Sequence, residues 1–532
     1  MLPFDKLLPF DRTAAPAVYL QVANSMIQHI RSGVIKPGFL LPGTRELAGI
    51  LGVHRKTVVA AYDELSAQGW IEAVARKGFH VMRELPEVKP GRWDKDGRSG
   101  TGGRSGGEGP MGGEGRLGGA GRLGAEGRSG KAGRSGTGDR EHAFSREMAA
   151  PFYPVGKGRF RLPVVSVPPP RLIIDDGHPD SRLAPLELLG REYRARLSNR
   201  GGRQQVYATM TAGSPRMREA MVGYLADTRG MQATVPNIMI THGAQMSIYI
   251  AAQLLLRPGD IVVVGEPGYY VATQVFENLG ASLLRVPVDE QGIDVDAVER
   301  LCRGKVVRML YLIPHHHHPT TVTLSPERRM RLLDIAERQN FAIVEDDYDY
   351  DFHYSSSPYL PLAASGHNNR VVYIGSFSKS LSSSIRVGFM VGPEAFIIEA
   401  TYLRRLIELR GDNHMEDALA ELIRNGDVGR HLKKVNRIYQ GRRDHLCQLL
   451  DSYLGDVIDY RKPSGGMAIW ARFNKRAPVK ELAGKALKMG LYMSDGQVYN
   501  THNRDYNAIR FGFASLNEGE MDEAVRILKN CL

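Results

Sequence analysis

The stretch VVYIGSFSK, residues 371–379, decides how the rest of the chain is interpreted. Its first four residues are β-branched or aromatic, a pattern typical of a short buried strand. Glycine and serine residues end that strand, and Lys379 follows. A lysine sheltered at a strand end can lose its proton and form a Schiff base with a carbonyl. An ordinary loop lysine is the alternative, which this stretch alone does not exclude.

The residues around Lys379 suit a phosphate group. Ser376 and Ser378 carry hydroxyls, and Arg386 adds a guanidinium seven positions after the lysine. An aldehyde that carries a phosphate describes pyridoxal 5′-phosphate (PLP), whose chemistry also needs an acid at the ring nitrogen. The stretch therefore predicts a PLP site, provided that the other parts occur elsewhere in the chain.

The composition is that of a globular protein with more than one domain. The chain has 532 residues, 42% of them hydrophobic and 24% charged. A net charge of +12 fits a polyanionic partner. The three cysteines form no Cys-x-x-Cys pair, which favours a reducing compartment. Without a signal-peptide pattern or an apolar run long enough to span a bilayer, we expect a cytoplasmic protein without a membrane partner.

Residues 12–83 predict a winged helix-turn-helix domain that binds double-stranded DNA. Helical patterns over 18–30, 45–51 and 54–68 are followed by a hairpin, 70–81, with a basic glycine tip. This order lays a recognition helix in the major groove and adds a wing. A basic three-helix module that binds protein is the alternative. The residues expected to face DNA are Arg45, His54, Arg55, Lys56, Thr57, Lys77 and Gly78.

Residues 84–165 predict a linker rich in glycine and arginine. From residue 97 to residue 138, glycine falls at every third position. A collagen-like triple helix is the alternative, but these triplets contain a single proline, and collagen needs far more. A flexible linker is the better interpretation.

Residues 166–532 predict an α/β domain with a mostly parallel sheet. Strand patterns at 238–240, 261–264, 306–313 and 341–344 alternate with helical segments. Active sites in such sheets gather at the carboxyl ends of the strands, so the residues that follow each strand are the candidate site.

Two of these strand ends offer parts of a cofactor site. Gly243, Ala244 and Gln245 open a helix after the first strand, and a helix N-terminus is a natural phosphate site. Tyr269 follows the second strand, where an aromatic ring can lie on a heteroaromatic cofactor. Each feature alone is also explained by an ordinary helix start or by packing.

The acidic run at residues 345–351 offers the carboxylate for a pyridine nitrogen. A calcium loop is excluded, because Phe352 and Pro358 stand where an EF-hand needs glycine and glutamate. The four histidines at 315–318 invite a metal, but no further ligand set accompanies them. We therefore expect no metal and interpret this segment as a loop beside the cofactor ring.

Arg510 lies in an apolar strand pattern at residues 509–514. A sheltered guanidinium is expected to bind a carboxylate in a bidentate manner, and that carboxylate can belong to a ligand or to an internal ion pair. The sequence alone leaves both open.

Taken together, the segments resemble known families. Residues 35–58 and 77–81 resemble the winged helix of GntR-type bacterial regulators, and the α/β part resembles fold-type I aminotransferases. The whole chain is similar to the MocR/GabR-type regulators, which fuse the two.

The resemblance assigns a role to each candidate residue. Lys379 would form the internal aldimine, Asp346 would pair with the pyridine nitrogen, and Tyr348 with the ring hydroxyl. Tyr207 would reach the partner subunit's cofactor in a homodimer, and Arg510 would bind the carboxylate of an amino-acid-like effector. Tyr269 would stack on the ring, and the phosphate would be held by Gly243, Ala244, Gln245, Ser376, Ser378 and Arg386.

Two departures from the aminotransferase pattern put efficient turnover in doubt. Residues 317–321 read HHPTT, without the asparagine and glycine of the enzymes, and three serines at 382–384 replace a spacer that contains proline. The sequence therefore predicts a regulator that senses an amine or amino acid through an aldimine at Lys379. The rivals are an active aminotransferase with a DNA-binding domain, a regulator of PLP itself, and a DNA-binding protein with a cofactor-free scaffold.

Overall fold

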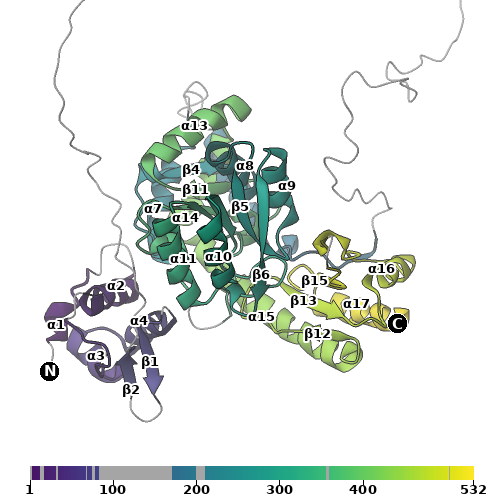
Figure 1. Cartoon of the computed structure of the whole chain (residues 1–532), viewed down its shortest axis with the longest axis horizontal. Coiled ribbons are helices and arrows are strands. Elements are labelled where there is room, and N and C mark those ends of the chain that lie inside the picture. The colour runs from purple at the N-terminus through teal and green to yellow at the C-terminus, as the bar shows by residue number, and fades with distance from the viewer. Residues whose placement is uncertain are drawn as a thin grey trace, which may run out of the picture. The chain divides into compact units, whose positions relative to one another are not determined.

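The computed structural model describes residues 3–11, 17–31, 34–67, 69–74, 78–82, 170–198, 210–354, 359–501 and 504–532 (Figure 1). The predicted linker, Lys77 and Tyr207 lie outside these ranges. Within them, no helix has the length and apolar character needed to cross a membrane.

The N-terminal part is a winged helix-turn-helix. Its core is built from a four-residue N-terminal helix, three longer helices and a hairpin, around buried residues that include Tyr62 and Trp70. The Tyr62 hydroxyl donates to the carbonyl oxygen of Pro42 at 2.7 Å, which holds the turn before the helix that begins at Thr44. Phe4 and Leu8 are buried in the same core, upstream of the expected start at residue 12. The elements are α1 (Phe4–Leu7), α2 (Val18–Arg31), α3 (Thr44–Leu51), α4 (Arg55–Ala67), β1 (Ile71–Val74) and β2 (Gly78–Val81).

The larger part is organised around an eight-stranded sheet in the order β4-β11-β10-β9-β8-β5-β6-β7. The pairs β10–β9, β9–β8, β8–β5 and β5–β6 are parallel, whereas β11 runs antiparallel to both β10 and β4. β4 therefore points the same way as β10, and the carboxyl ends of β4, β5, β8, β9 and β10 meet at one edge. The strands are β4 (Ile238–Thr241), β5 (Ile261–Glu266), β6 (Ser282–Asp289), β7 (Gly292–Ile293), β8 (Val307–Leu312), β9 (Ala342–Asp346), β10 (Val371–Ser376) and β11 (Gly388–Val391).

Helices cover both faces of this sheet, as Figure 1 shows. Successive strand residues alternate between two hydrophobic layers: Ile343 packs in one and Val344 in the other. The layer of Val344 includes α8 (Ala244–Leu255), α9 (Tyr270–Asn278) and α13 (Glu394–Glu408). The layer of Ile343 includes α7 (Pro215–Arg229), α10 (Val295–Gly304), α11 (Pro326–Gln339) and α14 (Asn413–Arg424). Burial on both faces explains why these strands read as continuous apolar runs.

The C-terminal residues add a smaller antiparallel sheet in the order β12-β13-β15, formed by Ile458–Tyr460, Ala468–Phe473 and Ala508–Gly512. A parallel pair joins β14 (Leu491–Tyr492) to β3 (Leu172–Ile173), which places residues 174–178 beside the end of β15. The helices of this part are α15 (Asp427–Leu454), α16 (Val479–Lys488) and α17 (Glu518–Cys531), whereas α5 (Leu186–Ser198) packs on α14. The predicted α/β fold class is confirmed.

Candidate functional site

Lys379 lies on α12 (Phe377–Ser380), the single helical turn that directly follows β10. Its Nζ donates a hydrogen bond to the carbonyl oxygen of Gly177 at 2.7 Å. Burial lowers the pKa of the lysine ammonium, because desolvation disfavours the charged form. A larger neutral fraction makes this amine a better nucleophile toward a carbonyl.

Asp346 is the last residue of β9 and carries an unused acceptor. Its Oδ2 accepts a hydrogen bond from the Tyr311 hydroxyl at 2.6 Å, whereas Oδ1 is buried without a partner. Burial raises the pKa of this carboxyl to about 7. A buried polar atom without a partner is costly, so the site fits a donor such as the protonated nitrogen of a pyridine ring.

The predicted phosphate residues gather around the N-terminus of α8. Gly243 has φ +82°, and a Cβ there would lie 2.8 Å from Nη2 of Arg386, so only glycine suits this position. Arg386 in turn donates to the carbonyl oxygen of His242 at 3.3 Å. First-turn amides of a helix have no acceptor within the helix, and a guanidinium complements an anion there.

The serines close the same corner of the site. Ser376 Oγ accepts from the backbone N–H of Ser378 at 3.2 Å, and Ser378 Oγ donates to the carbonyl oxygen of Ile385 at 3.0 Å. Both serines line one cavity with Ala244, Gln245 and Arg386. The arrangement fits a phosphate between these residues.

That cavity, of about 250 Å³, unites the predicted parts. Lys379 and Asp346 line it, together with the two predicted ring contacts, Tyr269 and Tyr348. The Tyr269 ring packs edge-on against His318 with centroids 5.1 Å apart. Lys379 Nζ lies 6.0 Å from the centre of the Tyr348 ring. Residues that follow β4, β5, β9 and β10 thus share one cavity at the sheet edge.

Arg510 is not among the described residues that line this cavity. It lies behind Asp176, which is one of them. Its side chain is 1% exposed, and its Nε lies 2.9 Å from Oδ1 of Asp176. Its Nη2 donates to the Tyr348 hydroxyl at 3.4 Å, and its Nη1 to the carbonyl oxygen of Pro319 at 3.4 Å. Of the two partners that the sequence left open for Arg510, the structure contains the internal one.

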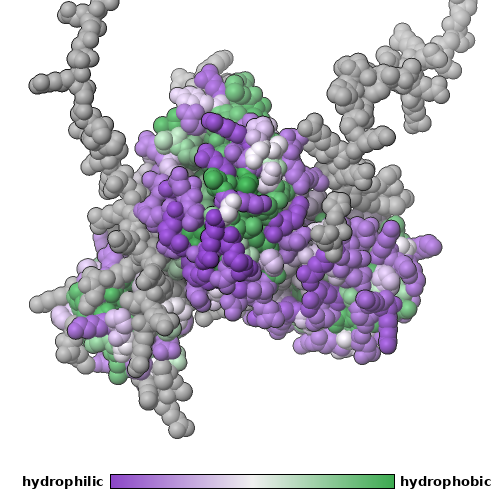
Figure 2. All heavy atoms as spheres, in the orientation of Figure 1, coloured by the Kyte–Doolittle hydropathy of each residue, from purple (hydrophilic) through white to green (hydrophobic). Residues whose placement is uncertain are grey.

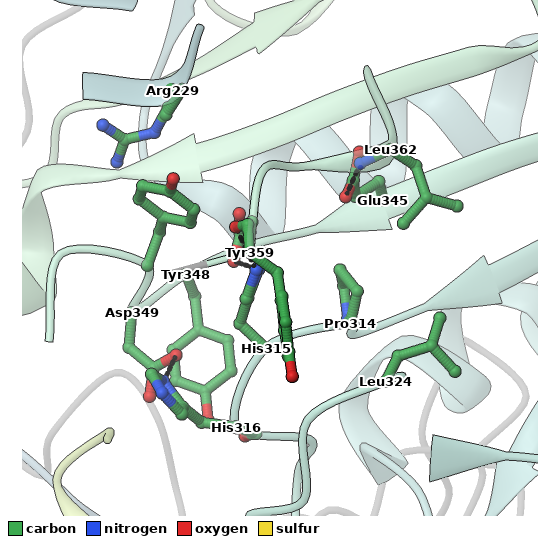
Figure 3. Close-up of polar contacts among 12 residues, drawn as sticks. Arg229, Pro314, His315, His316, Leu324, Glu345, Tyr348, Asp349, Tyr359 and Leu362 are labelled. Carbon is green, nitrogen blue, oxygen red and sulfur yellow. Dashed lines mark hydrogen bonds and ion pairs between the residues drawn. The ribbon is translucent and has the colours of Figure 1, made fainter. Parts of the chain in front are cut away.

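Three of the four consecutive histidines each contact a different carboxylate. His315 Nδ1 lies 3.0 Å from Asp347, His316 Nδ1 lies 3.1 Å from Asp349, and His318 Nε2 lies 2.8 Å from Asp176. Figure 3 shows His316 beside Asp349, with His315 and Tyr348 nearby.

The contacts of these histidines do not converge on one point. In the described part of the chain, no group of three or more histidine, cysteine, aspartate or glutamate residues is placed to hold a metal ion. His318 and Tyr348 line the cavity, which places this segment beside the candidate cofactor site.

The predicted DNA-facing residues lie at the start of α3 and α4. Arg45, Arg55 and Lys56 are exposed, and Thr57 is half-buried. His54 is exposed too, and its Nδ1 accepts from the backbone N–H of Lys56 at 3.2 Å, which caps the N-terminus of α4. The imidazole nitrogen thus accepts the hydrogen bond that a serine hydroxyl would accept at an N-cap position. Gly78 begins the second strand of the wing with φ +91°.

The sequence reasoning missed several polar contacts of the site. Asp176, Tyr311 and Tyr499 carry no motif of their own and lie far from residue 379 in sequence. Tyr499 donates to Asp176 Oδ1 at 3.0 Å. The pattern at 306–313 predicted a strand that contains Tyr311, but not which acid its hydroxyl meets. Only the fold brings Asp176 beside Arg510.

Comparisons with known families match both parts of the chain. Residues 194–528 match the family described as aminotransferase class I and II. Residues 18–81 match the family described as bacterial regulatory proteins, gntR family. The two matches correspond to the α/β part and to the winged helix.

Individual relatives fall into the same two groups. The chain is 26% identical over 530 residues to the probable rhizopine catabolism regulatory protein MocR of Rhizobium meliloti, covering 98% of this chain and 95% of the relative. It is 28% identical to aromatic-amino-acid aminotransferase 1 of Thermococcus litoralis, over 66% of this chain and 85% of that relative. The crystal structure of LysN, the α-aminoadipate aminotransferase of Thermus thermophilus, complexed with N-(5′-phosphopyridoxyl)-L-leucine, superposes with a TM-score of 0.63 at 26% identity, over 68% of this chain and 92% of that one.

Proposed function

We propose that the protein senses an amine with its α/β part and binds a DNA operator with its winged helix. The chain belongs to the aminotransferase class I and II family and carries a GntR-family regulatory domain. The prediction of a MocR/GabR-type transcriptional regulator with PLP as its cofactor is confirmed at the level of the family. The proposal also includes the roles of the individual residues, the amine effector, the homodimer, the cytoplasmic location and the domain boundaries at residues 83 and 165.

The observation that carries the proposal is the set of complementary groups that line the cavity. Asp346 offers a buried acceptor without a partner, Lys379 offers an amine with a lowered pKa, and the start of α8 offers amides beside Arg386. These three features match the ring nitrogen, the aldehyde and the phosphate of one molecule. When bound, PLP supplies an aldehyde that condenses reversibly with primary amines.

The other residues then hold and enclose the cofactor. The Tyr348 hydroxyl is the group assigned to the ring hydroxyl, and Tyr269 is the ring assigned to stacking. Burial raises the pKa of both phenols, so both stay protonated. The Tyr348 hydroxyl donates to the carbonyl oxygen of His316 at 3.3 Å. Tyr207, assigned to the partner subunit's site, lies outside the described residues.

A homodimer is supported by an exposed apolar stripe on α13. Ile398, Tyr402 and Leu406 are 45%, 63% and 85% exposed and follow one another at intervals of four residues. Figure 2 shows hydrophobic side chains near this helix at the top of the view. A second copy of the chain would cover such a stripe.

An effector regulates DNA binding only if it favours one state of the protein over another. The test is a mobility-shift titration of the operator with PLP-loaded protein, with and without a primary amine. A change in operator affinity that disappears in Lys379→Ala supports the proposal. A change that persists in Lys379→Ala contradicts it, and PLP alone shifting the affinity favours the regulator of PLP itself.

An active aminotransferase is the second candidate, because Lys379, Asp346 and Tyr348 are all present in the cavity. An amino-acid substrate would need a free guanidinium for its carboxylate, however, and Arg510 is already paired with Asp176. We therefore favour the regulator. Steady multiple turnover of amino and keto acids at enzyme-like rates of about 1 s⁻¹ or more would favour the enzyme.

A further inference from the structure

Asp176 and Lys379 belong to the wall of the same cavity. The Asp176 side chain is 42% exposed, whereas that of Arg510 is 1% exposed. An incoming ligand therefore meets a negative group first, with the positive group behind it.

Each of the three guanidinium nitrogens of Arg510 already has a partner within the protein. Its Nε contacts the Asp176 carboxylate, and its two terminal nitrogens donate to the Tyr348 hydroxyl and to the carbonyl oxygen of Pro319. A buried guanidinium that has these partners gains little from a second carboxylate, which would have to break the existing ion pair.

Asp176 is held in place by its own backbone and cannot easily move aside. The carbonyl oxygen of Asp175 accepts from the backbone N–H of Gly512 at 2.9 Å, which ties the loop to the end of β15. Asp175 Oδ1 accepts from the backbone N–H groups of Gly177 and His178 at 2.9 and 3.0 Å. Gly177 has φ +87° and packs against Arg510.

The carboxylate of Asp176 retains capacity for another donor. Oδ1 is contacted by Arg510 and by the Tyr499 hydroxyl, and Oδ2 by His318 Nε2. An ionised carboxylate has about four acceptor sites, so one remains. Although the partial burial of Asp176 opposes ionisation, His318 and Arg510 lower the pKa of this carboxyl, which keeps it charged.

We propose that the effector is a primary amine whose far end is a hydrogen-bond donor, most simply a second ammonium group, and not an amino acid with a carboxylate there. Asp176 is the residue that sets this preference. A carboxylate at the far end would lie against Asp176, and like charges repel each other in a desolvated cavity. The inference rests on the proposed function and revises the carboxylate role expected for Arg510.

The test uses three amines of equal length: 1,5-diaminopentane, pentylamine and 5-aminopentanoate. Each is titrated into the PLP-loaded full-length protein, with the visible absorbance of the cofactor and calorimetric heat as readouts. We expect the diamine to bind at least about tenfold more tightly than pentylamine, and 5-aminopentanoate to bind most weakly.

Asp176→Asn should abolish the advantage of the diamine over pentylamine and raise the affinity for 5-aminopentanoate about tenfold, because it frees Arg510. Asp175→Asn removes the same charge from a neighbouring side chain that does not line the cavity. The amide oxygen of asparagine can still accept from the backbone N–H groups of Gly177 and His178, so we expect this variant to keep the wild-type order. Asp176→Glu keeps the charge and should keep that order too. Should Asp176→Asn fold poorly, the order in which the wild-type protein binds the three amines still tests the inference.

Tighter binding of 5-aminopentanoate than of the diamine by the wild-type protein would overturn the inference, as would an unchanged order in Asp176→Asn. Both results would leave the proposed function standing, since an amine would still bind. A protein that responds to none of the three amines would overturn both.

Discussion

Asp346 Oδ2 accepts a hydrogen bond from the Tyr311 hydroxyl at 2.6 Å, which orients the carboxyl and leaves Oδ1 buried without a partner. Tyr311 lies on β8 and Asp346 at the end of β9, two neighbouring parallel strands. The sheet itself therefore aims an acid into the cavity, and this acid distinguishes the site from a polar pocket of similar size.

Replacing Asp346 should weaken the binding of PLP more than replacing Tyr311. We expect Asp346→Asn to raise the dissociation constant of PLP at least about tenfold, because a hydrogen bond to a charged group contributes roughly 1.5–3 kcal/mol. Tyr311→Phe should have a smaller effect, because the acid remains. Equilibrium dialysis measures both. Equal affinity in the wild type and Asp346→Asn would show that the ring nitrogen binds elsewhere.

The same acid should make the cofactor-free protein sensitive to pH. Its pKa is about 7 in the folded protein against an ordinary value of 3.8. Between these pH values the unfolded chain ionises it and the folded chain does not, so the folded state loses stability as the pH rises from about 4 to 7. Asp346→Asn lacks this loss, which thermal unfolding of the two proteins across this range would reveal. Parallel pH profiles would contradict the assignment.

Gly243 and Gly259 form a matched pair for the phosphate corner. Both have positive φ, +82° and +91°, but a Cβ at Gly243 would meet the Arg386 guanidinium, whereas one at Gly259 would meet nothing within 4 Å. Alanine at either position should cost about 1 kcal/mol of stability through backbone strain. Only Gly243→Ala should weaken the binding of PLP, by about tenfold or more. Equal PLP affinity in the two variants would place the phosphate elsewhere.

Two neighbouring residues at the start of α4 have different expected roles: Arg55 contacts DNA, and His54 caps the helix. Arg55→Ala should weaken operator binding and reduce its dependence on salt, because one phosphate or base contact is lost. His54→Ala should instead lower the stability of the winged helix by about 1 kcal/mol, the usual cost of a lost N-cap, and His54→Ser should restore it. Fluorescence anisotropy and thermal unfolding distinguish the two. A salt dependence that is the same in Arg55→Ala and the wild type would remove Arg55 from the interface.

The α13 stripe predicts the oligomeric state. Leu406 is 85% exposed, so Leu406→Glu costs the isolated subunit little, but it would place a charge in the proposed interface. We expect dimers in analytical ultracentrifugation of the wild-type protein and monomers of this variant. Val306→Glu changes another exposed apolar residue, 88% exposed and outside the stripe, and should leave dimers intact. A monomeric wild-type protein would contradict the homodimer.

The sequence predicted the fold well because its signals are local. The apolar runs that became β9 and β10 are buried on both faces, and the helix-turn-helix has its own turn and wing signals. Residues that directly follow a strand, such as Asp346 and Lys379, were predictable because parallel strands end at one edge.

The partners of Arg510 were not predictable in the same way. Asp176 lies 334 residues away in sequence and reaches the guanidinium only because β3 pairs with β14 beside the end of β15. Likewise, nothing in the run of four histidines indicates that three of them meet three different carboxylates. Contacts of this kind depend on tertiary packing and not on spacing.

The most direct test of the account is borohydride reduction of the PLP-loaded protein, followed by peptide mapping by mass spectrometry. The account predicts one phosphopyridoxyl group, covalently attached to Lys379, and a Lys379→Ala variant that is neither coloured nor labelled. A yellow protein whose cofactor is released intact after reduction, or a label on another lysine, would contradict it.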